Sequence, residues 1–199
     1  MLNASCTEAR GSRRESSLVV ANMANLLSGL RIFLAVAWYG VFAFAGQRPM
    51  TLGAIAVVAA GTDYVDGRIA RRLGVASGAG RWLDNIADIT FVLGALGCEA
   101  GAGQIPIYIP ALIAISFAQY AIDSSIVSGF GAAPIHSRLG HWGGILNYAL
   151  AIALSIAPSP AAPGAVIGVA APLIAVFYIV AIGERVASYR AIRGSQNQI

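Results

Sequence analysis

Four aspartates are the residues best suited to chemistry, because they gather in one short part of the chain. Asp63 and Asp66 lie three residues apart, and Asp84 and Asp88 lie four residues apart. On an α-helix, residues three or four apart share a face, so each pair predicts a stripe of carboxylates. Four carboxylates would balance two divalent cations, and the lack of nearby cysteine or histidine favours Mg²⁺ or Mn²⁺ over Zn²⁺.

Small residues accompany the two predicted carboxylate stripes. Gly67 and Ala70 fall on the first stripe with Arg71 at its edge, and Gly80 falls on the second. Residues without a bulky side chain leave room for a large ligand to approach the helix backbone. We therefore expect a ligand site beside the carboxylates.

The four aspartates are costly if they lie at membrane depth. One aspartate at the centre of a bilayer costs about 2.5–3.5 kcal/mol, and four cost on the order of 10 kcal/mol, which bound cations would offset. The alternative is structural: Asp63 and Asp66 would begin a turn, while Asp84 and Asp88 would lie at a solvated helix start. This structural interpretation would account for any two of the acids, but it accounts poorly for all four together.

The elements that must position these aspartates are apolar helices. The chain of 199 residues is 57% hydrophobic and 11% charged, whereas a soluble domain would carry about twice that charged fraction. Apolar stretches of about 17–25 residues recur along it, each long enough to cross a bilayer. We predict an all-α membrane bundle of about six transmembrane helices in residues 21–199, after a polar tail in residues 1–20. The expected helices cover residues 22–46, 50–73, 81–101, 105–129, 141–158 and 163–190.

The arginines predict the orientation of this bundle. All 13 basic residues are arginine, and with the N-terminus inside the cell only Arg48 would lie on the outer side. By the positive-inside rule, we expect a multi-pass protein of the cell membrane with both termini and the active site facing the cytoplasm. The arginines lie between apolar spans without interleaved aromatic residues, which favours membrane lipids over nucleic acid as their partner.

The aspartates belong to a longer pattern. Residues 63–88, DYVDGRIARRLGVASGAGRWLDNIAD, resemble the signature of the CDP-alcohol phosphotransferase family, DxxDGxxAR, eight residues and GxxxDxxxD, at every defined position. The resemblance implies that Asp63, Asp66 and Asp84 hold two Mg²⁺ or Mn²⁺ ions. It implies that Asp88 completes the metal site and acts as general base. It also suggests a homodimer.

The same resemblance implies a reaction. A phosphatidyl group would pass from CDP-diacylglycerol to a small alcohol, phosphorylated or not, with release of CMP. Gly67, Ala70, Arg71 and Gly80 would border the CDP-linked lipid, and the guanidinium of Arg71 would suit its phosphates.

Two further groups of polar residues are candidates for substrate binding. Asn25, Ser28 and Arg31, in NLLSGLR, resemble the family pattern NxxTxxR and suggest a nucleotide-side role; a polar helix cap followed by a snorkelling arginine is the structural alternative. Arg138 and Arg185 could bind a phosphorylated acceptor, although arginines at helix ends also satisfy the positive-inside rule. Asp123, His136 and His141 lie near the same junction without an assigned role.

Two alternatives remain open. A transferase of the CDP-choline or CDP-ethanolamine type would use diacylglycerol as acceptor, and the signature does not separate it from users of CDP-diacylglycerol. An ion-coupled transporter would also place acids in a membrane, but with acids spread across the bilayer and with broken helices. Here the acids gather at one predicted membrane edge, which favours an enzyme.

Overall fold

The computed structural model describes residues 26–44, 49–73, 78–128, 138–156 and 163–196, and these contain six α-helices and no strand. The prediction of an all-α protein is confirmed. The first helix covers Leu26–Phe44. The others are α2 (Pro49–Leu73), α3 (Gly78–Gly101), α4 (Tyr108–Ser128), α5 (Arg138–Ile156) and α6 (Pro163–Gln196).

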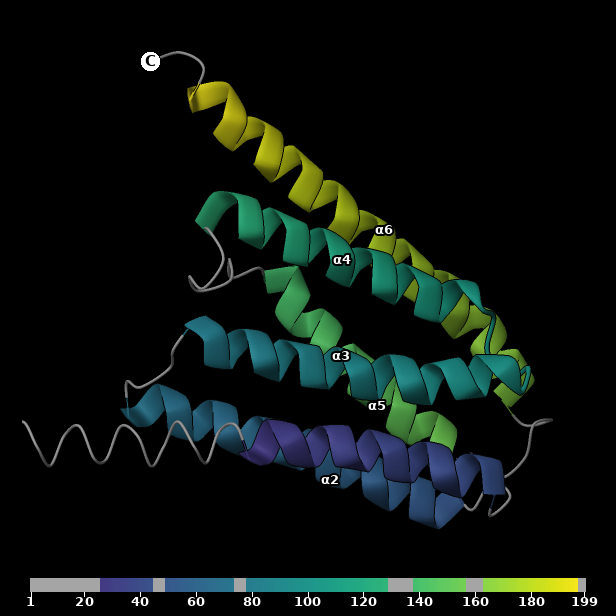
Figure 1. Ribbon diagram of the computed structural model, residues 1–199. Helices are drawn as coiled ribbons and strands as arrows, with labels where there is room; N and C mark the ends of the chain where they lie inside the picture. The colour runs from purple at the N-terminus through teal and green to yellow at the C-terminus, as the bar shows by residue number, and fades with distance from the viewer. Residues whose placement is uncertain (1–25, 45–48, 74–77, 129–137, 157–162, 197–199) are drawn as a thin grey trace, which may run out of the picture.

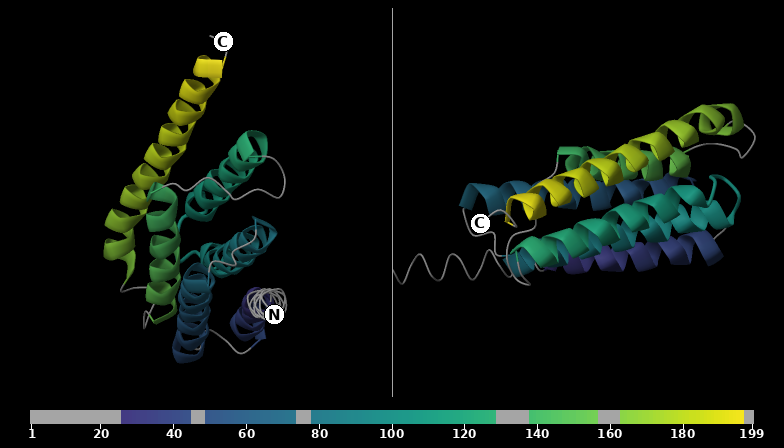
Figure 2. Two further views of the ribbon diagram at one scale, coloured as in Figure 1. Left: turned by 90° about the vertical axis from the view of Figure 1, so that its left-hand side faces the viewer. Right: turned by 90° about the horizontal axis from the view of Figure 1, so that it is seen from above.

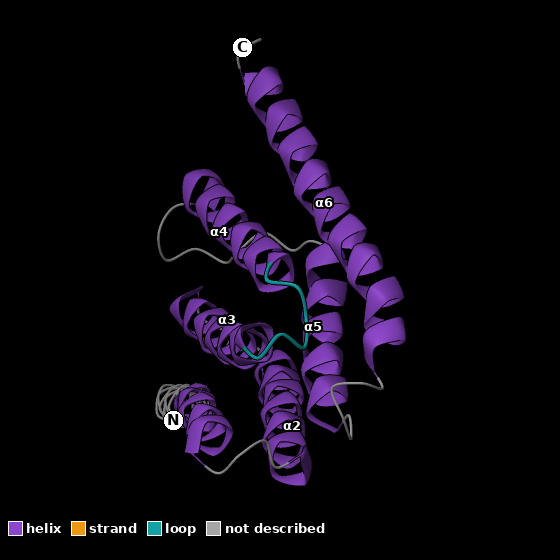
Figure 3. Ribbon diagram, turned by 90° about the vertical axis from the view of Figure 1, so that its right-hand side faces the viewer, coloured by secondary structure: helices purple, strands orange, loops and turns teal. Residues whose placement is uncertain are grey.

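The helices run alternately up and down through one bundle (Figure 1). Helix α2 packs on α5, α4 packs on α6, and α3 contacts α2, α4 and α5. The first helix and α6 lie on opposite sides of the bundle (Figures 2 and 3). The end of α2, the start of α3, the end of α4, the start of α5 and the end of α6 share one end of the bundle (Figure 1). This arrangement brings the sequence-distant candidate residues to the same end.

Proline and glycine set several helix boundaries. Pro49 and Pro163 open α2 and α6, where proline's missing N–H is not needed. At the end of α3, the backbone N–H groups of Gly103 and Gln104 donate to the carbonyls of Ala100 (3.0 Å) and Glu99 (2.9 Å). Gly103 has a φ of 75°, so this pattern is the Schellman motif that glycine favours.

Four predicted boundaries differ from the structure by three residues or more. Helix α5 begins at Arg138 rather than at residue 141, and α6 ends at Gln196 rather than at residue 190. The starts of α4 and α3 also differ. Helix α4 begins at Tyr108 rather than at residue 105, because Pro106 disfavours helical conformation in the residue before it. Helix α3 begins at Gly78 rather than at residue 81. From the sequence, its first small residues are assigned to the loop between α2 and α3. Glycine destabilises a helix little at its end, because few backbone hydrogen bonds depend on the terminal residues.

The outer surface of the bundle is apolar over much of its area. Phe33, Phe44, Met50 and Leu173 are among the large hydrophobic residues exposed there. Three helical segments are long and apolar enough to cross a membrane, namely Leu26–Phe44, Leu139–Ile156 and Ile167–Ala187. These features suggest a membrane protein. Six spans remain a prediction.

Candidate active site

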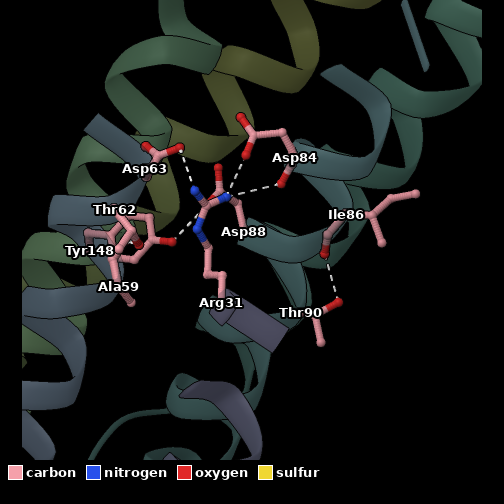
Figure 4. Close-up of polar contacts among 9 residues, drawn as sticks. All are labelled: Arg31, Ala59, Thr62, Asp63, Asp84, Ile86, Asp88, Thr90 and Tyr148. Atoms are coloured by element: carbon pink, nitrogen blue, oxygen red, sulfur yellow. Dashed lines mark hydrogen bonds and ion pairs between the residues drawn. The ribbon is translucent and has the colours of Figure 1, made fainter. Parts of the chain in front are cut away.

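Helices α2 and α3 bring three of the four predicted aspartates together. Asp63 of α2 faces Asp84 and Asp88, which lie one turn apart on α3 (Figure 4). One carboxylate oxygen from each lies within 4.8 Å of the other two. Helical periodicity accounts for the pair on α3, and the packing of α2 against α3 supplies the third carboxylate.

Arg31 of the first helix occupies the centre of this carboxylate cluster (Figure 4). Its Nη1 atom lies 2.7 Å from Asp84 Oδ1 and 2.8 Å from Asp88 Oδ1, and its Nη2 atom lies 3.4 Å from Asp63 Oδ1. The Arg31 side chain is 0% exposed. One buried cation therefore holds carboxylates from two other helices, and the nucleotide-side role expected from the sequence stays a prediction.

Tyr148 of α5 also contacts the cluster, and sequence reasoning missed it. Its hydroxyl donates a hydrogen bond of 2.7 Å to Asp88 Oδ1. Tyr148 and its neighbour Asn147 are buried polar residues in a predominantly apolar helix. Buried polar groups need partners, so their position in an apolar span was the available signal.

The three carboxylates fit a divalent cation. All of their ligand atoms are oxygen, which Mg²⁺ and Mn²⁺ prefer. Their side chains are 37% (Asp63), 28% (Asp84) and 26% (Asp88) exposed, so an ion could reach them. Arg31 supplies one positive charge against three negative charges, and the remaining negative charge favours binding of a divalent ion.

The other residues predicted to bind the metals or the donor lie close to this cluster along the chain. Asp66 follows Asp63 on α2 and precedes Gly67, Ala70 and Arg71, but the side chains at these positions lie outside the described residues. Gly80 is half-buried in the first turn of α3. Ser28 is buried one turn before Arg31. Asn25 lies outside the described part of the chain.

Arg185 of α6, a predicted acceptor residue, makes its direct contacts with neutral groups. Its Nη1 donates to the backbone carbonyl of Ser116 at 2.7 Å, and its guanidinium lies 5.2 Å from the ring centre of Tyr120. The Tyr120 hydroxyl accepts a hydrogen bond of 3.0 Å from Asn85, the neighbour of Asp84. Tyr120 therefore links Arg185 to the helix that carries two of the carboxylates.

The structure shows fewer contacts for the other polar residues near the junction of α4 and α5. Arg138 is the first residue of α5, and its side chain lies outside the described residues, as does the whole of His136. His141 is exposed, with its ring centre 6.5 Å from that of Trp142. Asp123 is half-buried on α4.

An all-helical bundle with long apolar helices and three clustered carboxylates at one end suits a membrane enzyme. Comparison with known proteins agrees: residues 21–183 match the CDP-alcohol phosphatidyltransferase family. The chain belongs to this family, as its aspartate signature suggested.

Two curated relatives come from Mycobacterium tuberculosis, strains CDC 1551 / Oshkosh and ATCC 25618 / H37Rv. Each is named a probable phosphatidylglycerophosphate synthase and is 32% identical over 147 residues, which cover 70% of this chain and 68% of the relative. Together, the family and these relatives support a membrane transferase of phospholipid synthesis. Family membership thus favours a transferase over the transporter alternative. It implies a CDP-alcohol donor and an alcohol acceptor.

Proposed function

We propose that this protein transfers a phosphatidyl group from CDP-diacylglycerol to a small alcohol and releases CMP. The observation that carries the proposal is the convergence of Asp63, Asp84 and Asp88 on one cluster at the end of the bundle. Glycerol phosphate is the first candidate acceptor, because the two curated relatives bear the name phosphatidylglycerophosphate synthase.

Asp63, Asp66, Asp84 and Asp88 would hold two divalent ions, with Mg²⁺ or Mn²⁺ as the candidates. When bound, such ions neutralise the charge of a diphosphate and improve CMP as a leaving group. The proposed donor-binding residues of this chain are Asn25, Ser28, Arg31, Gly67, Ala70, Arg71 and Gly80. Arg31 keeps Asp63, Asp84 and Asp88 close together although they repel one another.

Asp88 is the proposed general base. The acceptor oxygen would form a bond with the lipid-side phosphorus of the donor, while the bond from that phosphorus to the oxygen of the CMP group breaks. The acceptor's hydroxyl proton would pass to Asp88. Both contacts that the structure gives this carboxylate fall on Oδ1, so Oδ2 is the oxygen proposed to take the proton.

Arg185 is the proposed binding residue for an acceptor phosphate, together with Arg138. Support comes from the partners of Arg185, which are a backbone carbonyl and an aromatic ring. Neither partner neutralises its charge, and a guanidinium is well matched to a phosphate. The Asn85–Tyr120 hydrogen bond ties this arginine to α3.

The distribution of arginines supports a cytoplasmic orientation for the site. Eight arginines lie in helical segments near the carboxylate end of the bundle, namely Arg68, Arg71, Arg72, Arg81, Arg138, Arg185, Arg190 and Arg193. By the positive-inside rule this end, and with it both termini, would face the cytoplasm. A water-soluble acceptor and CMP could then exchange with the cytoplasm directly.

The proposed function can be tested with purified protein, CDP-diacylglycerol and Mg²⁺ or Mn²⁺. Glycerol phosphate, inositol phosphate, inositol and serine would be supplied separately, with CMP release and the lipid product followed by mass spectrometry. We expect CMP and phosphatidylglycerophosphate in equal amounts with glycerol phosphate. Release of CMP with another acceptor alone would reassign the acceptor. Activity only with CDP-choline or CDP-ethanolamine and diacylglycerol would contradict the proposed donor.

A further inference from the structure

The hydroxyl of Tyr148 is placed where it can control the carboxylate of Asp88. Tyr148 is 8% exposed in α5, and its hydroxyl donates to Asp88 Oδ1 at 2.7 Å. Arg31 Nη1 approaches the same oxygen at 2.8 Å. Residues from two other helices thus engage one oxygen of this carboxylate (Figure 4).

Aromatic packing fixes the ring that carries this hydroxyl. The Tyr148 ring stacks on Phe91, with centres 5.8 Å apart and planes inclined by 18°. Phe91 follows Asp88 by three residues on α3, and therefore on the same side of that helix. Trp38 of the first helix packs edge-on against Phe91 at 6.0 Å. This packing fixes the position of the Tyr148 hydroxyl relative to the Asp88 carboxylate.

A free aspartate would not hold this orientation. The terminal torsion of an aspartate side chain is broad and nearly two-fold, so either oxygen could face a substrate. Two donors on Oδ1 remove that freedom and leave Oδ2 for a new partner. A general base must lie within about 2.6–3.2 Å of the proton it accepts, and orientation of this carboxylate therefore affects the rate.

We propose that Tyr148 is a positioning residue that orients the Asp88 carboxylate so that Oδ2 accepts the proton of the acceptor hydroxyl. This inference rests on the proposed function, in which Asp88 is the general base. The tyrosine itself exchanges no proton with the substrate. Its hydroxyl holds Oδ1, the acceptor's O–H bond breaks, and the proton moves to Oδ2.

The test is Tyr148→Phe, which removes the hydroxyl and keeps the stacked ring. We expect kcat for CMP release to fall about tenfold or more, because a misplacement of about 1 Å can cost about 100-fold. The KM values for donor and acceptor should stay near those of the wild type, as should Mn²⁺ binding measured by electron paramagnetic resonance. A parallel loss of Mn²⁺ binding would overturn the inference, since Tyr148 would then act on metal binding and not on the proton acceptor.

Tyr178→Phe is the matched control. Tyr178 is also a buried tyrosine, but its hydroxyl donates to Asn147 Oδ1 rather than to an aspartate. We expect this variant to lose a similar amount of thermal stability and to keep its kcat. Equal losses of kcat in both tyrosine variants would show a general packing effect and overturn the inference.

A double-mutant comparison separates the inference from the proposed function. If Tyr148 acts through Asp88, Tyr148→Phe should lower kcat little further in the Asp88→Asn background. Additive losses would overturn the positioning role while leaving the proposed function intact. A wild-type protein that releases no CMP from any CDP-linked donor would overturn the proposed function, and the role of Tyr148 with it.

Phe91→Leu provides a second variant in case Tyr148→Phe does not fold. It keeps the Tyr148 hydroxyl and removes the ring on which Tyr148 stacks. We expect a smaller fall in kcat, again without a further effect in the Asp88→Asn background. An unchanged kcat in Phe91→Leu would contradict the inference, as would a fall in kcat that adds to that of Asp88→Asn.

Discussion

Two arginines at the same end of the bundle have different surroundings. Arg31 is fully buried and contacts three carboxylates, from Asp63, Asp84 and Asp88. Arg185 lies between α4 and α6, where its direct contacts are a backbone carbonyl and the face of Tyr120. Carboxylates in direct contact thus balance the charge of Arg31, whereas the direct contacts of Arg185 are neutral and the acids Asp123 and Glu184 act on it from farther away.

This difference indicates different roles. A buried arginine among carboxylates is structural first, because its loss leaves uncompensated negative charge. An arginine with neutral partners suits recognition of a phosphate, and Arg185 reaches the carboxylate-bearing helix through Tyr120 and Asn85. Substitutions at these residues can show whether Arg31 and its carboxylates form the reaction centre and whether Arg185 binds the acceptor.

The largest effect is expected at the carboxylates themselves. Asp63→Asn and Asp84→Asn each remove a charged ligand and keep the shape of the side chain, so we expect loss of Mn²⁺ binding and of detectable CMP release. Glu99→Gln is the matched control, since Glu99 is a buried acid on α3, about 22 Å beyond Asp84 along the helix. Full activity in either aspartate variant would show that the carboxylate cluster is misassigned.

Arg31→Met should destabilise the metal-free protein. Removing one partner of a buried ion pair costs about 3–5 kcal/mol, and we expect less here because the carboxylates are partly exposed. The thermal midpoint without metal should fall, and Mg²⁺ should raise it more in this variant than in the wild type. Arg68→Met, which alters an exposed arginine beside Tyr64, should change the midpoint little. Equal midpoints for the two variants would argue against a central role for Arg31.

The Asp88→Asn variant tests whether Asp88 acts mainly as the general base or mainly as a metal ligand. We expect turnover to fall by about 100-fold or more, the usual contribution of a general base, while donor affinity and most of the metal occupancy survive, because Asp63, Asp66 and Asp84 remain as ligands. The measurements are turnover, CDP-diacylglycerol binding and Mn²⁺ occupancy in the same preparation. Loss of Mn²⁺ together with donor binding would make Asp88 a ligand instead.

The smallest effect is expected at Arg185. Arg185→Gln should raise the KM for glycerol phosphate by about tenfold, because a charge-assisted hydrogen bond contributes about 1.5–3 kcal/mol, and should leave kcat nearly unchanged. The KM for CDP-diacylglycerol measured in the same assay is the internal control. A larger effect on the donor than on the acceptor would place Arg185 on the nucleotide side.

The sequence predicted much of this arrangement because helical periodicity is local. The spacing of Asp84 and Asp88 places them on one face of a helix whatever surrounds it. The sequence did not predict that Arg31 would lie among the carboxylates, or that Tyr148 would donate to Asp88. Those contacts join residues 53 and 60 positions apart, and they depend on how three helices pack, which leaves no local pattern.

The carboxylate cluster of Asp63, Asp84 and Asp88 is proposed to be a divalent metal site. Electron paramagnetic resonance of Mn²⁺ added to the purified protein tests it most directly, with wild type and Asp84→Asn compared at equal concentration. We expect saturable binding of Mn²⁺ by the wild type, displaced by Mg²⁺, and strongly weakened binding by the variant. Equal Mn²⁺ binding by both proteins, or none by the wild type in the presence of CDP-diacylglycerol, would contradict it.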